Sequence, residues 1–546
     1  MGRSSRVVFG AYGCALACLC FAAACGSSSP KSNAGQGGEA TQSGGSSLQG
    51  GAAAQGGSQA QGGSAAPGGA DASGGAPKTG GSAGGGSKST GGTKATGGVN
   101  GAGGPANPDD DGLIGWATAH PSGAPTGGYE PLGANPTMTC TASDMKTLRD
   151  CLFRAKKSDK TNTDTRAGAP DWATWELHEG VTGGWKKYPV VIYVKGIIDC
   201  SQNDSGVAMT QALYEAGDPL CGTETGAGCQ QAVIQAKVER GDISVIGIPG
   251  DGGEPPTLNG GWLMFRGQEN VIVRNLRIVN ATDYWPSFET CATGITDRDY
   301  CAWNAEPDGM TLDNTSRVWI DHCEFTDGPM FEGKNPDKTK YKMYDGLFDI
   351  KNGSDFITLS YNQFYNHNKA MLVGATDSAD GNYGITFHHN YVHYVQQRMP
   401  RVRNGQVHVL NNLYQGPQKS DYTEEYYFGY ALGLGYNSQI YSEGNSFEIS
   451  GATAQSLLSA DFDAWAQYFT DVGSWLAGQP VDLNAAAAAV VNARNASNGG
   501  ATPFIGPVTW KPADHYAYTA DTSAETVKQK VLSRSGLGRV TPDPSL

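Results

Sequence analysis

The sequence has little positive charge and lacks the paired-cysteine spacing that is typical of zinc sites. Its 546 residues include 39 Lys and Arg against 53 Asp and Glu, which gives a formal net charge of −14. Nucleic-acid-binding domains usually present a basic face, so this balance argues against that class. None of the 12 cysteines occurs in a CxxC pair, so a zinc site is not expected. An acidic protein also repels a polyanionic substrate unless its cations are concentrated locally.

Long apolar runs are also scarce, and the clearest one lies at the N-terminus. Two arginines precede an apolar stretch from Val7 to Ala24, which has the form of a signal peptide. The small residues before Cys25 resemble a bacterial lipobox, so we expect residues 1–25 to be a lipoprotein-type signal with Cys25 as the lipidated residue. The resemblance implies an exported protein tethered to the outer membrane or cell surface through Cys25. Simple cleavage and secretion, or a short membrane helix, are the alternatives.

Aromatic residues are absent from positions 26–107, where Leu48 and Val99 are the only sizeable apolar residues. Such a Gly-, Ser- and Ala-rich chain cannot bury enough apolar surface to offset its ordering entropy, so we expect it to be disordered. A Gly-rich coil of this length has a root-mean-square span of about 50 Å. We interpret residues 26–107 as a spacer and assign the folded domain to residues 108–546.

Eight cysteines follow the spacer, and an even number in an exported protein suggests disulfide bonds. Cys221 with Cys229, and Cys291 with Cys301, would close short loops. Cys323 lies within a strand pattern and is expected to be a buried free thiol. The others are Cys140, Cys151 and Cys200.

The folded part contains short β-rich runs in which apolar residues recur at relative positions 0, 2 and 7. The recurrence fits Val271/Val273/Ile278, Val318/Ile320/Phe325, Ile357/Leu359/Phe364, Ile385/Phe387/Val392 and Val407/Val409/Tyr414. Equal rungs joined by unequal loops are typical of a solenoid. The strands of a β-sandwich, the alternative, would be joined by hairpin turns. The pattern therefore predicts an all-β solenoid.

A recurring asparagine and three predicted helices are the other structural features of the folded part. Asparagine recurs at relative position 5, which predicts a ladder of side-chain amides formed by Asn362, Asn390, Asn412 and Asn445. Helices are expected at 143–156, 453–476 and 521–535, and the last two are expected to pack against the solenoid. For the last one we predict a capping box of Thr522 and Glu525 and a buried stripe of Ala524, Val527, Val531 and Leu532.

Four carboxylates are candidates for a metal site: Glu306, Asp308, Asp345 and Asp349. Glu306 and Asp308 are two residues apart and would share one face of a strand. Asp345 and Asp349 would lie about 13 Å apart in a straight strand, too far for one ion. Either the chain bends at Gly346, or different ions are bound. Oxygen-only ligands favour calcium or magnesium over zinc.

Five motifs resemble the calcium-dependent pectate lyases of polysaccharide lyase family 1 in order and spacing. They are GluProAspGlyMet (306–310), ValTrpIleAspHis (318–322), AspGlyLeuPheAsp (345–349), HisAsnLysAla (367–370) and ArgMetProArgValArg (398–403). The resemblance implies a single-stranded right-handed parallel β-helix with long loops on one side and short capping helices.

The same resemblance implies a role for individual residues. Asp308, Asp345 and Asp349 match calcium ligands, and Glu306 matches a further position that is commonly Asp in the family. Lys369 and Arg403 match substrate-binding cations, and Arg398 matches the catalytic arginine. Asp321 and His322, in contrast, are expected to hold a neighbouring rung by hydrogen bonds.

The implied reaction is calcium-assisted β-elimination in 1,4-linked α-D-galacturonan (pectate), which gives 4,5-unsaturated oligogalacturonates. Bound Ca²⁺ would also let an acidic protein bind an acidic polymer. Residue chemistry alone would nominate Lys369 as the base, because the pKa of lysine shifts more readily than that of arginine; the resemblance selects Arg398. We expect a monomer whose partner is this polysaccharide.

Two rival functions differ in the residues that they need. A calcium-independent pectin lyase acting on methylated pectin has no use for clustered acids. A non-catalytic β-helix that binds polysaccharide has no need of Arg398. Both the acids and the arginine are present, so the pectate lyase reading is preferred.

Overall fold

The computed structural model describes residues 112–129, 138–157, 175–177, 189–288, 303–328, 343–378, 381, 383–417, 428–460, 467–497 and 506–540. The predicted signal with Cys25, the predicted spacer (26–107), and Cys291 and Cys301 lie outside these residues. Across the described part of the chain, no helix combines the length and the apolar character needed to span a membrane.

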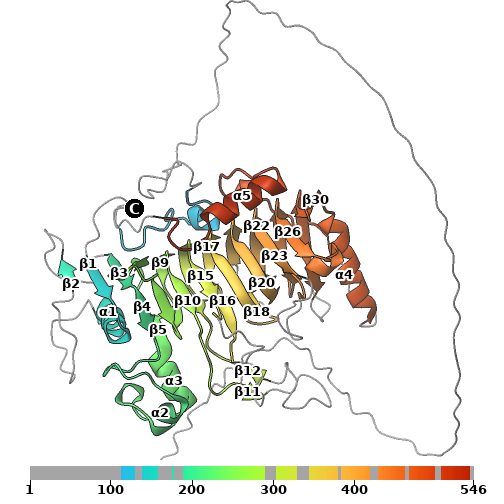
Figure 1. Cartoon of the computed structure of the whole chain (residues 1–546). Helices are drawn as coiled ribbons and strands as arrows, with labels where there is room; N and C mark the ends of the chain where they lie inside the picture. Colours follow the sequence, from blue (N-terminus) through green and yellow to red (C-terminus); the bar gives the residue numbers. More distant parts are fainter. Residues whose placement is uncertain are drawn as a thin grey trace, which may run out of the picture. The chain divides into compact units, whose positions relative to one another are not determined.

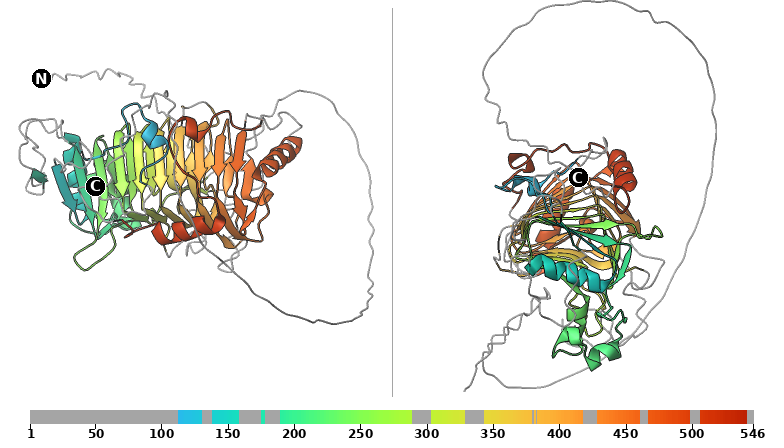
Figure 2. Two further views of the ribbon diagram at one scale, coloured as in Figure 1. Left: turned by 90° about the horizontal axis from the view of Figure 1, so that it is seen from above. Right: turned by 90° about the vertical axis from the view of Figure 1, so that its left-hand side faces the viewer.

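A parallel β-helix forms the described domain, with strands stacked in sequence order along one axis (Figures 1 and 2), except that β2 pairs antiparallel to the outer edge of β1. This confirms the predicted solenoid. One long sheet makes the first side of the coil. Its strands, in spatial order, are β2 (Trp175–Leu177), β1 (Met138–Ala142), β3 (Val190–Lys195), β6 (Ile243–Ile248), β9 (Glu269–Arg274), β14 (Ser316–Asp321), β17 (Asp355–Ser360), β19 (Tyr383–His388), β22 (Gly405–Leu410), β25 (Gln439–Glu443) and β28 (Tyr468–Val472).

The second side of the coil is a series of parallel pairings from β4 to β29. It comprises β4 (Ile197–Asp199), β7 (Thr257–Asn259), β10 (Arg277–Val279), β15 (Glu324–Thr326), β18 (Gln363–Val373), β20 (Tyr391–Gln397), β23 (Leu413–Pro417), β26 (Ser446–Ser450) and β29 (Trp475–Leu476), with β30 (Gln479–Pro480) antiparallel to β29.

The third side is a parallel series that shares the long strand β18 with the second. It comprises β5 (Gln235–Val238), β8 (Trp262–Arg266), β13 (Met310–Asp313), β16 (Gly346–Lys351), β18, β21 (Arg401–Val402), β24 (Leu432–Leu434) and β27 (Leu458–Ala460). A short antiparallel pair, β11 (Ser287–Phe288) with β12 (Trp303–Asn304), stands apart from the coil.

The core is built from columns of identical rung positions. One column on the first side runs in register through Val271, Val318, Ile357, Ile385, Val407, Ile440 and Phe469, all buried. Each such side chain contributes about 1.5–3 kcal/mol by leaving water. The spacing recognised in the sequence is therefore the stacking repeat itself.

The predicted asparagine ladder is confirmed. The Nδ2 of Asn362 donates to Oδ1 of Asn390, that of Asn390 to Asn412, and that of Asn412 to Asn445, each at 3.0 Å. Because these amides are buried, each bond satisfies a polar group that would otherwise be costly.

Asp321 and His322 have the structural role that was predicted. Asp321 Oδ2 lies 2.7 Å from Arg274 Nε and 2.7 Å from His322 Nδ1. Ser360 on the next rung donates to Asp321 Oδ1 at 2.6 Å. Burial opposes ionisation, but the charges of His322 and Arg274 prevail and hold the pKa of Asp321 below its usual value.

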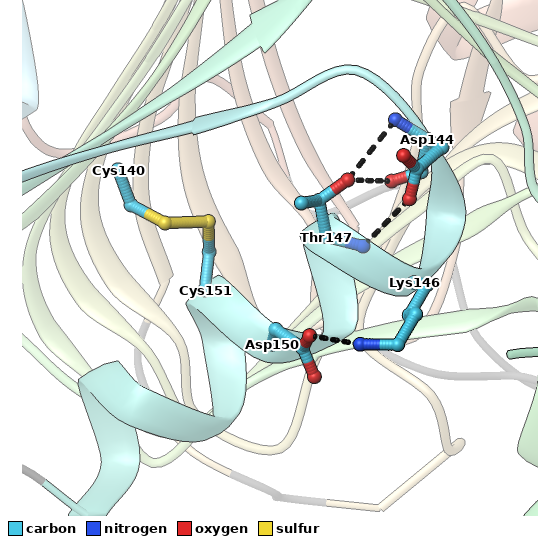
Figure 3. The surroundings of a disulfide bond; sticks show 6 residues. All are labelled: Cys140, Asp144, Lys146, Thr147, Asp150 and Cys151. Carbon is cyan, nitrogen blue, oxygen red and sulfur yellow. Dashed lines mark hydrogen bonds and ion pairs between the residues drawn. A yellow bond between two sulfur atoms is a disulfide. The ribbon is translucent and has the colours of Figure 1, made fainter. Parts of the chain in front are cut away.

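One end of the coil is covered by α1 (Met145–Lys157), in agreement with the predicted helix (Figure 2). Asp144 caps this helix by accepting from Thr147 N at 2.8 Å, and a disulfide joins Cys151 to Cys140 of β1 (Figure 3). The second described disulfide is Cys221–Cys229, as predicted. It lies in an excursion that contains α2 (Gln211–Ala216) and α3 (Ala227–Ile234). Cys200 and Cys323 are buried free thiols.

The helix predicted at 453–476 was wrong. The described part of that range holds a short 3-10 turn, Gln455–Leu457, and then the strands β27, β28 and β29. These strands continue the parallel stack, so tertiary pairing overrides the local helical preference. The nearby helix is instead α4 (Leu483–Ser497), a run of alanines that covers the other end of the coil.

The predicted C-terminal helix is present as α5 (Ala524–Arg534), but its cap and stripe differ from expectation. Ser523, not Thr522, is the N-cap and accepts from Thr526 N at 3.1 Å. Val527 and Val531 are fully buried, whereas Leu532 is 41% exposed. A helix that lies on the outside of the solenoid needs only a narrow apolar stripe.

Candidate active site

Four of the predicted site residues lie on, or just before, successive strands of the third side of the coil. Asp308 stands two residues before the start of β13, Asp345 and Asp349 belong to the next rung, and Lys369 lies within β18. Gly309 N donates to the carbonyl of Gly346 at 2.9 Å, and Gly346 pairs in register with Lys369. Neighbouring parallel strands are about 4.8 Å apart, so these residues lie on adjacent rungs of the stack.

Arg398 lies one rung further along the stack. Lys369 pairs with Gln397, and the carbonyl of Arg398 accepts from Met371 N at 2.8 Å. Arg398 lies between β20 and β21, with β21 carrying the chain on toward Arg403. The motifs are thus far apart in sequence but adjacent in the stack.

Three aspartates converge on one point. Carboxylate oxygens of Asp308, Asp345 and Asp349 all lie within 4.8 Å of one another. The separation calculated for a straight strand does not apply, because Asp345 stands just outside β16 while Asp349 lies within it. Gly346 makes the approach feasible, since a Cβ there would collide with oxygens of Asp349 and Asp308. The cluster is therefore built around a position that tolerates no side chain.

Asp308 is the most enclosed member of this cluster. It is fully buried, accepts from Thr311 Oγ1 at 2.6 Å and accepts from Gly346 N at 3.1 Å. Burial raises the pKa of Asp308 to about 7, and the neighbouring charge of Asp349 adds to the rise. Negative charge at this point needs a cation for stabilisation.

Lys351 supplies one such cation, and it was not identified in the sequence. Its Nζ lies 2.9 Å from Asp349 Oδ2 and 3.1 Å from Asp308 Oδ2. Burial alone would lower the pKa of Lys351, but the charges of Asp308 and Asp349 raise it well above its usual value. The sequence feature that could have identified Lys351 is its spacing. Residues two apart in a strand face the same side, and Lys351 follows Asp349 by two residues.

Glu306 is not brought into the cluster. Its side chain is exposed and hydrogen-bonds Gln231, while its backbone N–H donates to the buried Asp283 at 3.1 Å. The prediction that Glu306 belongs to the ligand set therefore gains no support from the arrangement of the described residues.

Lys369 and Arg403 are both engaged with carboxylates. Lys369 Nζ lies 2.7 Å from Asp345 Oδ1, which connects the lysine directly to the acidic cluster. Arg403 is 1% exposed, and its Nε lies 2.7 Å from Asp377 Oδ1. Its Nη1 also donates to the carbonyls of Gly374 and Ala375, each at 3.3 Å.

Arg398 has an uncommon conformation. Its φ of 62° lies in the left-handed region, which costs a residue with a Cβ roughly 1–3 kcal/mol. Among the described residues, its buried Nε has no hydrogen-bond partner. A strained, incompletely satisfied cation one rung beyond Lys369 is the kind of feature that structures retain at functional sites.

Comparisons with known proteins identify the family of this chain. A family model described as pectate lyase matches residues 142–540. A pectate lyase of Bacillus subtilis (strain 168) is 32% identical over 375 residues, 64% of this chain and 82% of that protein. Pectate lyase E of Dickeya chrysanthemi is 30% identical over 395 residues, 69% of this chain and 92% of that protein. A solved pectate lyase bound to a hexasaccharide aligns with a TM-score of 0.58 at 26% identity, over 78% of this chain and 97% of that chain.

The fold and the site together define a parallel β-helix polysaccharide lyase. The family match extends over well more than half of the sequence. The chain belongs to the pectate lyase family, and its activity is that of a pectate lyase.

Proposed function

We propose that this lyase cleaves pectate by β-elimination with a calcium ion held by Asp308, Asp345 and Asp349, and with Arg398 as the base. The observation that carries the proposal is the convergence of the three carboxylates on rungs adjacent to Lys369 and Arg398.

The donor set fits calcium. It consists of carboxylate oxygens, which hard cations such as Ca²⁺ prefer, and it contains no sulfur or imidazole ligand among the described residues. Burial, and after it the charge of Asp349, raises the pKa of Asp308 even though Lys351 is in contact, so a further cation there would stabilise the carboxylate. When bound, Ca²⁺ would neutralise these carboxylates and polarise a uronate carboxylate of the substrate.

Lys369 and Arg403 supply the cations for binding substrate. A galacturonate carboxylate can replace Asp345 as a partner of Lys369, because charge-assisted bonds of this kind are exchangeable between carboxylates. Arg403 presents a fork of donors that suits bidentate recognition, once its contact with Asp377 is exchanged for a substrate carboxylate.

Arg398 takes the proton from C5 of the uronate. The electron pair of the C5–H bond forms the C4–C5 double bond, and the C4–O bond to the leaving sugar breaks. Water protonates the departing oxygen. Arginine normally stays protonated, so a neutral Arg398 requires desolvation and neighbouring positive charge. The Nε of Arg398 is buried, and the residue before it, Gln397, pairs in register with Lys369.

A chelator-controlled assay tests this function. Polygalacturonate and the full chain should give an unsaturated product that absorbs in the ultraviolet; excess chelator should abolish its formation, and added calcium should restore it. Undiminished product formation in excess chelator would exclude the calcium mechanism while leaving lyase activity intact.

We also propose that the domain is exported and tethered. This rests on the sequence alone: the signal-like residues 1–25, the lipobox-like position of Cys25 and the Gly-rich spacer at 26–107. A spacer spanning about 50 Å would let the β-helix reach polymer away from a membrane surface. Fractionation of cells that express the full chain tests the proposal.

A further inference from the structure

A buried histidine–aspartate pair lies directly beside the acidic cluster and has no part in the proposed reaction. His367 is in β18, and Asp327 follows β15, the strand that pairs with the start of β18. His367 Nδ1 lies 2.7 Å from Asp327 Oδ1, and both residues are at least 98% buried. An enclosed pair of titratable groups is costly to bury, so it requires a physical explanation.

The other nitrogen of the imidazole contacts the backbone of two site residues. His367 Nε2 lies 2.8 Å from the carbonyl oxygen of Asp345 and 3.0 Å from the carbonyl oxygen of Lys369. Carbonyl oxygens only accept hydrogen bonds, so Nε2 must carry the hydrogen and donate to both. The imidazole thus joins two adjacent rungs at the point where each provides a charged group to the site.

Asp327 fixes this orientation of the ring. Whether the shared proton resides on Nδ1 or on the carboxyl group, Nε2 keeps its hydrogen and the two carbonyl contacts persist. The arrangement therefore does not depend on which of the two groups holds the shared proton. It is the same device by which a carboxylate or carbonyl orients the histidines of metal sites.

The environment of Asp327 argues against a role in packing alone. Its Oδ2 is buried and has no hydrogen-bond partner among the described residues. Asp327 also lines a small cavity together with residues that include Asn280, Tyr344 and Gly346. Burial raises the pKa of Asp327, although the charge of His367 partly offsets the rise. An apolar pair of similar size would avoid these costs, so retention of the polar pair indicates a functional constraint.

We propose that His367, oriented by Asp327, is a positioning residue: it holds the backbone of Asp345 and Lys369 so that the carboxylate and the ammonium meet the metal and substrate in register. This inference rests on the calcium function proposed above. The inference predicts that loss of His367 weakens calcium affinity. A carboxylate whose backbone is free to shift loses conformational entropy when it binds an ion, and this loss opposes binding.

Two substitutions at the same position separate this role from a structural one. His367→Gln places an amide donor close to the position of Nε2, whereas His367→Asn reaches toward Asp327 and withdraws the donor from both carbonyls. Calcium would be titrated calorimetrically into the full-length wild type and each variant, and thermal stability would be measured alongside. Loss of an outer-shell partner typically weakens metal affinity by about 10- to 100-fold.

We expect His367→Asn to bind calcium at least about 10-fold more weakly than the wild type, and His367→Gln to regain most of that loss. His389→Asn is the matched control. His389 is also buried and hydrogen-bonds a carboxylate, Asp521, at 2.9 Å, but it lies on the first side of the coil. The His389→Asn substitution should change the melting temperature and leave calcium affinity unaltered.

The outcomes are distinct. Wild-type affinity in His367→Asn, or an equal loss in His367→Gln, would overturn the positioning role. If His367→Asn does not fold, Asp327→Ala replaces it: the imidazole remains but is no longer oriented, and unchanged calcium affinity in that protein would overturn the inference. A wild type that binds no calcium would instead refute the proposed calcium function itself.

Discussion

Replacing Asp308 by asparagine tests the acidic cluster with little change in shape. The side chain is fully buried, and its Oδ1 accepts from Gly346 N at 3.1 Å, a bond that an amide oxygen can retain. The hydroxyl of Thr311, which now donates to Oδ2 at 2.6 Å, can rotate to accept from an amide. The variant should therefore fold, so that its effect on calcium binding is interpretable.

The magnitude follows from the charge removed. At an effective dielectric constant near 20, a carboxylate and a divalent cation about 4 Å apart interact by about 8 kcal/mol. The asparagine dipole recovers part of this, so we expect calcium binding to weaken by about 3 kcal/mol or more, roughly 100-fold. The initial rate of unsaturated product should fall in parallel at limiting calcium and recover in part at high calcium.

Isothermal titration of calcium into both proteins measures the effect. Glu306→Gln is the matched comparison, because Glu306 is only two residues away but is exposed and outside the cluster. We expect its affinity to remain within about threefold of the wild type, since exposed charges are strongly screened. Equal affinity in Asp308→Asn and the wild type would refute the assignment of the cluster as the calcium site.

Further predictions concern other parts of the molecule. Arg398→Lys should retain calcium affinity but lose most of its turnover; near-normal turnover would place the base elsewhere. Lys351→Met should lower the free energy of unfolding of the apoprotein by about 3–5 kcal/mol, because a buried carboxylate pair loses its cation. The same substitution should tighten calcium binding, since the Lys351 ammonium no longer competes with calcium for the carboxylates. Weaker calcium binding would contradict this competition. The hydrogen bond from His389 lowers the pKa of Asp521 to about 2. Asp521→Asn should therefore be less stable than the wild type above pH 4, and the difference in melting temperature should vanish as the pH falls toward 2. A difference in melting temperature that does not depend on pH would contradict this linkage. Cys25→Ser should release the protein from membranes, and unchanged partitioning would exclude lipidation.

The repeat was readable from the sequence because a solenoid uses the same rung position again and again. Val318, Ile357 and Ile385 share one column in the structure, and the relative positions of these residues were sufficient to find it. The strands at the C-terminal end of the coil were harder to predict from the sequence. Residues 458–460 and 468–472 form strands only because earlier rungs offer them edges to pair with, and a local window contains no information on such edges.

The order of the site residues was also predictable, but their convergence was not. A straight-strand estimate placed Asp345 and Asp349 too far apart for one ion, and it could not show that Asp345 lies outside β16. Lys351 was not predicted as a site residue, although its two-residue spacing from Asp349 can be read from the sequence. The contacts of His367 with the backbone of Asp345 and Lys369 depend on main-chain positions, which no side-chain pattern reveals.

Diffraction from crystals of Arg398→Lys grown with calcium and an oligogalacturonate would test the central claim most directly. We expect an anomalous peak between Asp308, Asp345 and Asp349 that also contacts a uronate carboxylate, with residue 398 facing C5 of the adjoining sugar. Calcium bound at another surface, with an empty acidic cluster beside well-ordered substrate, would contradict the account.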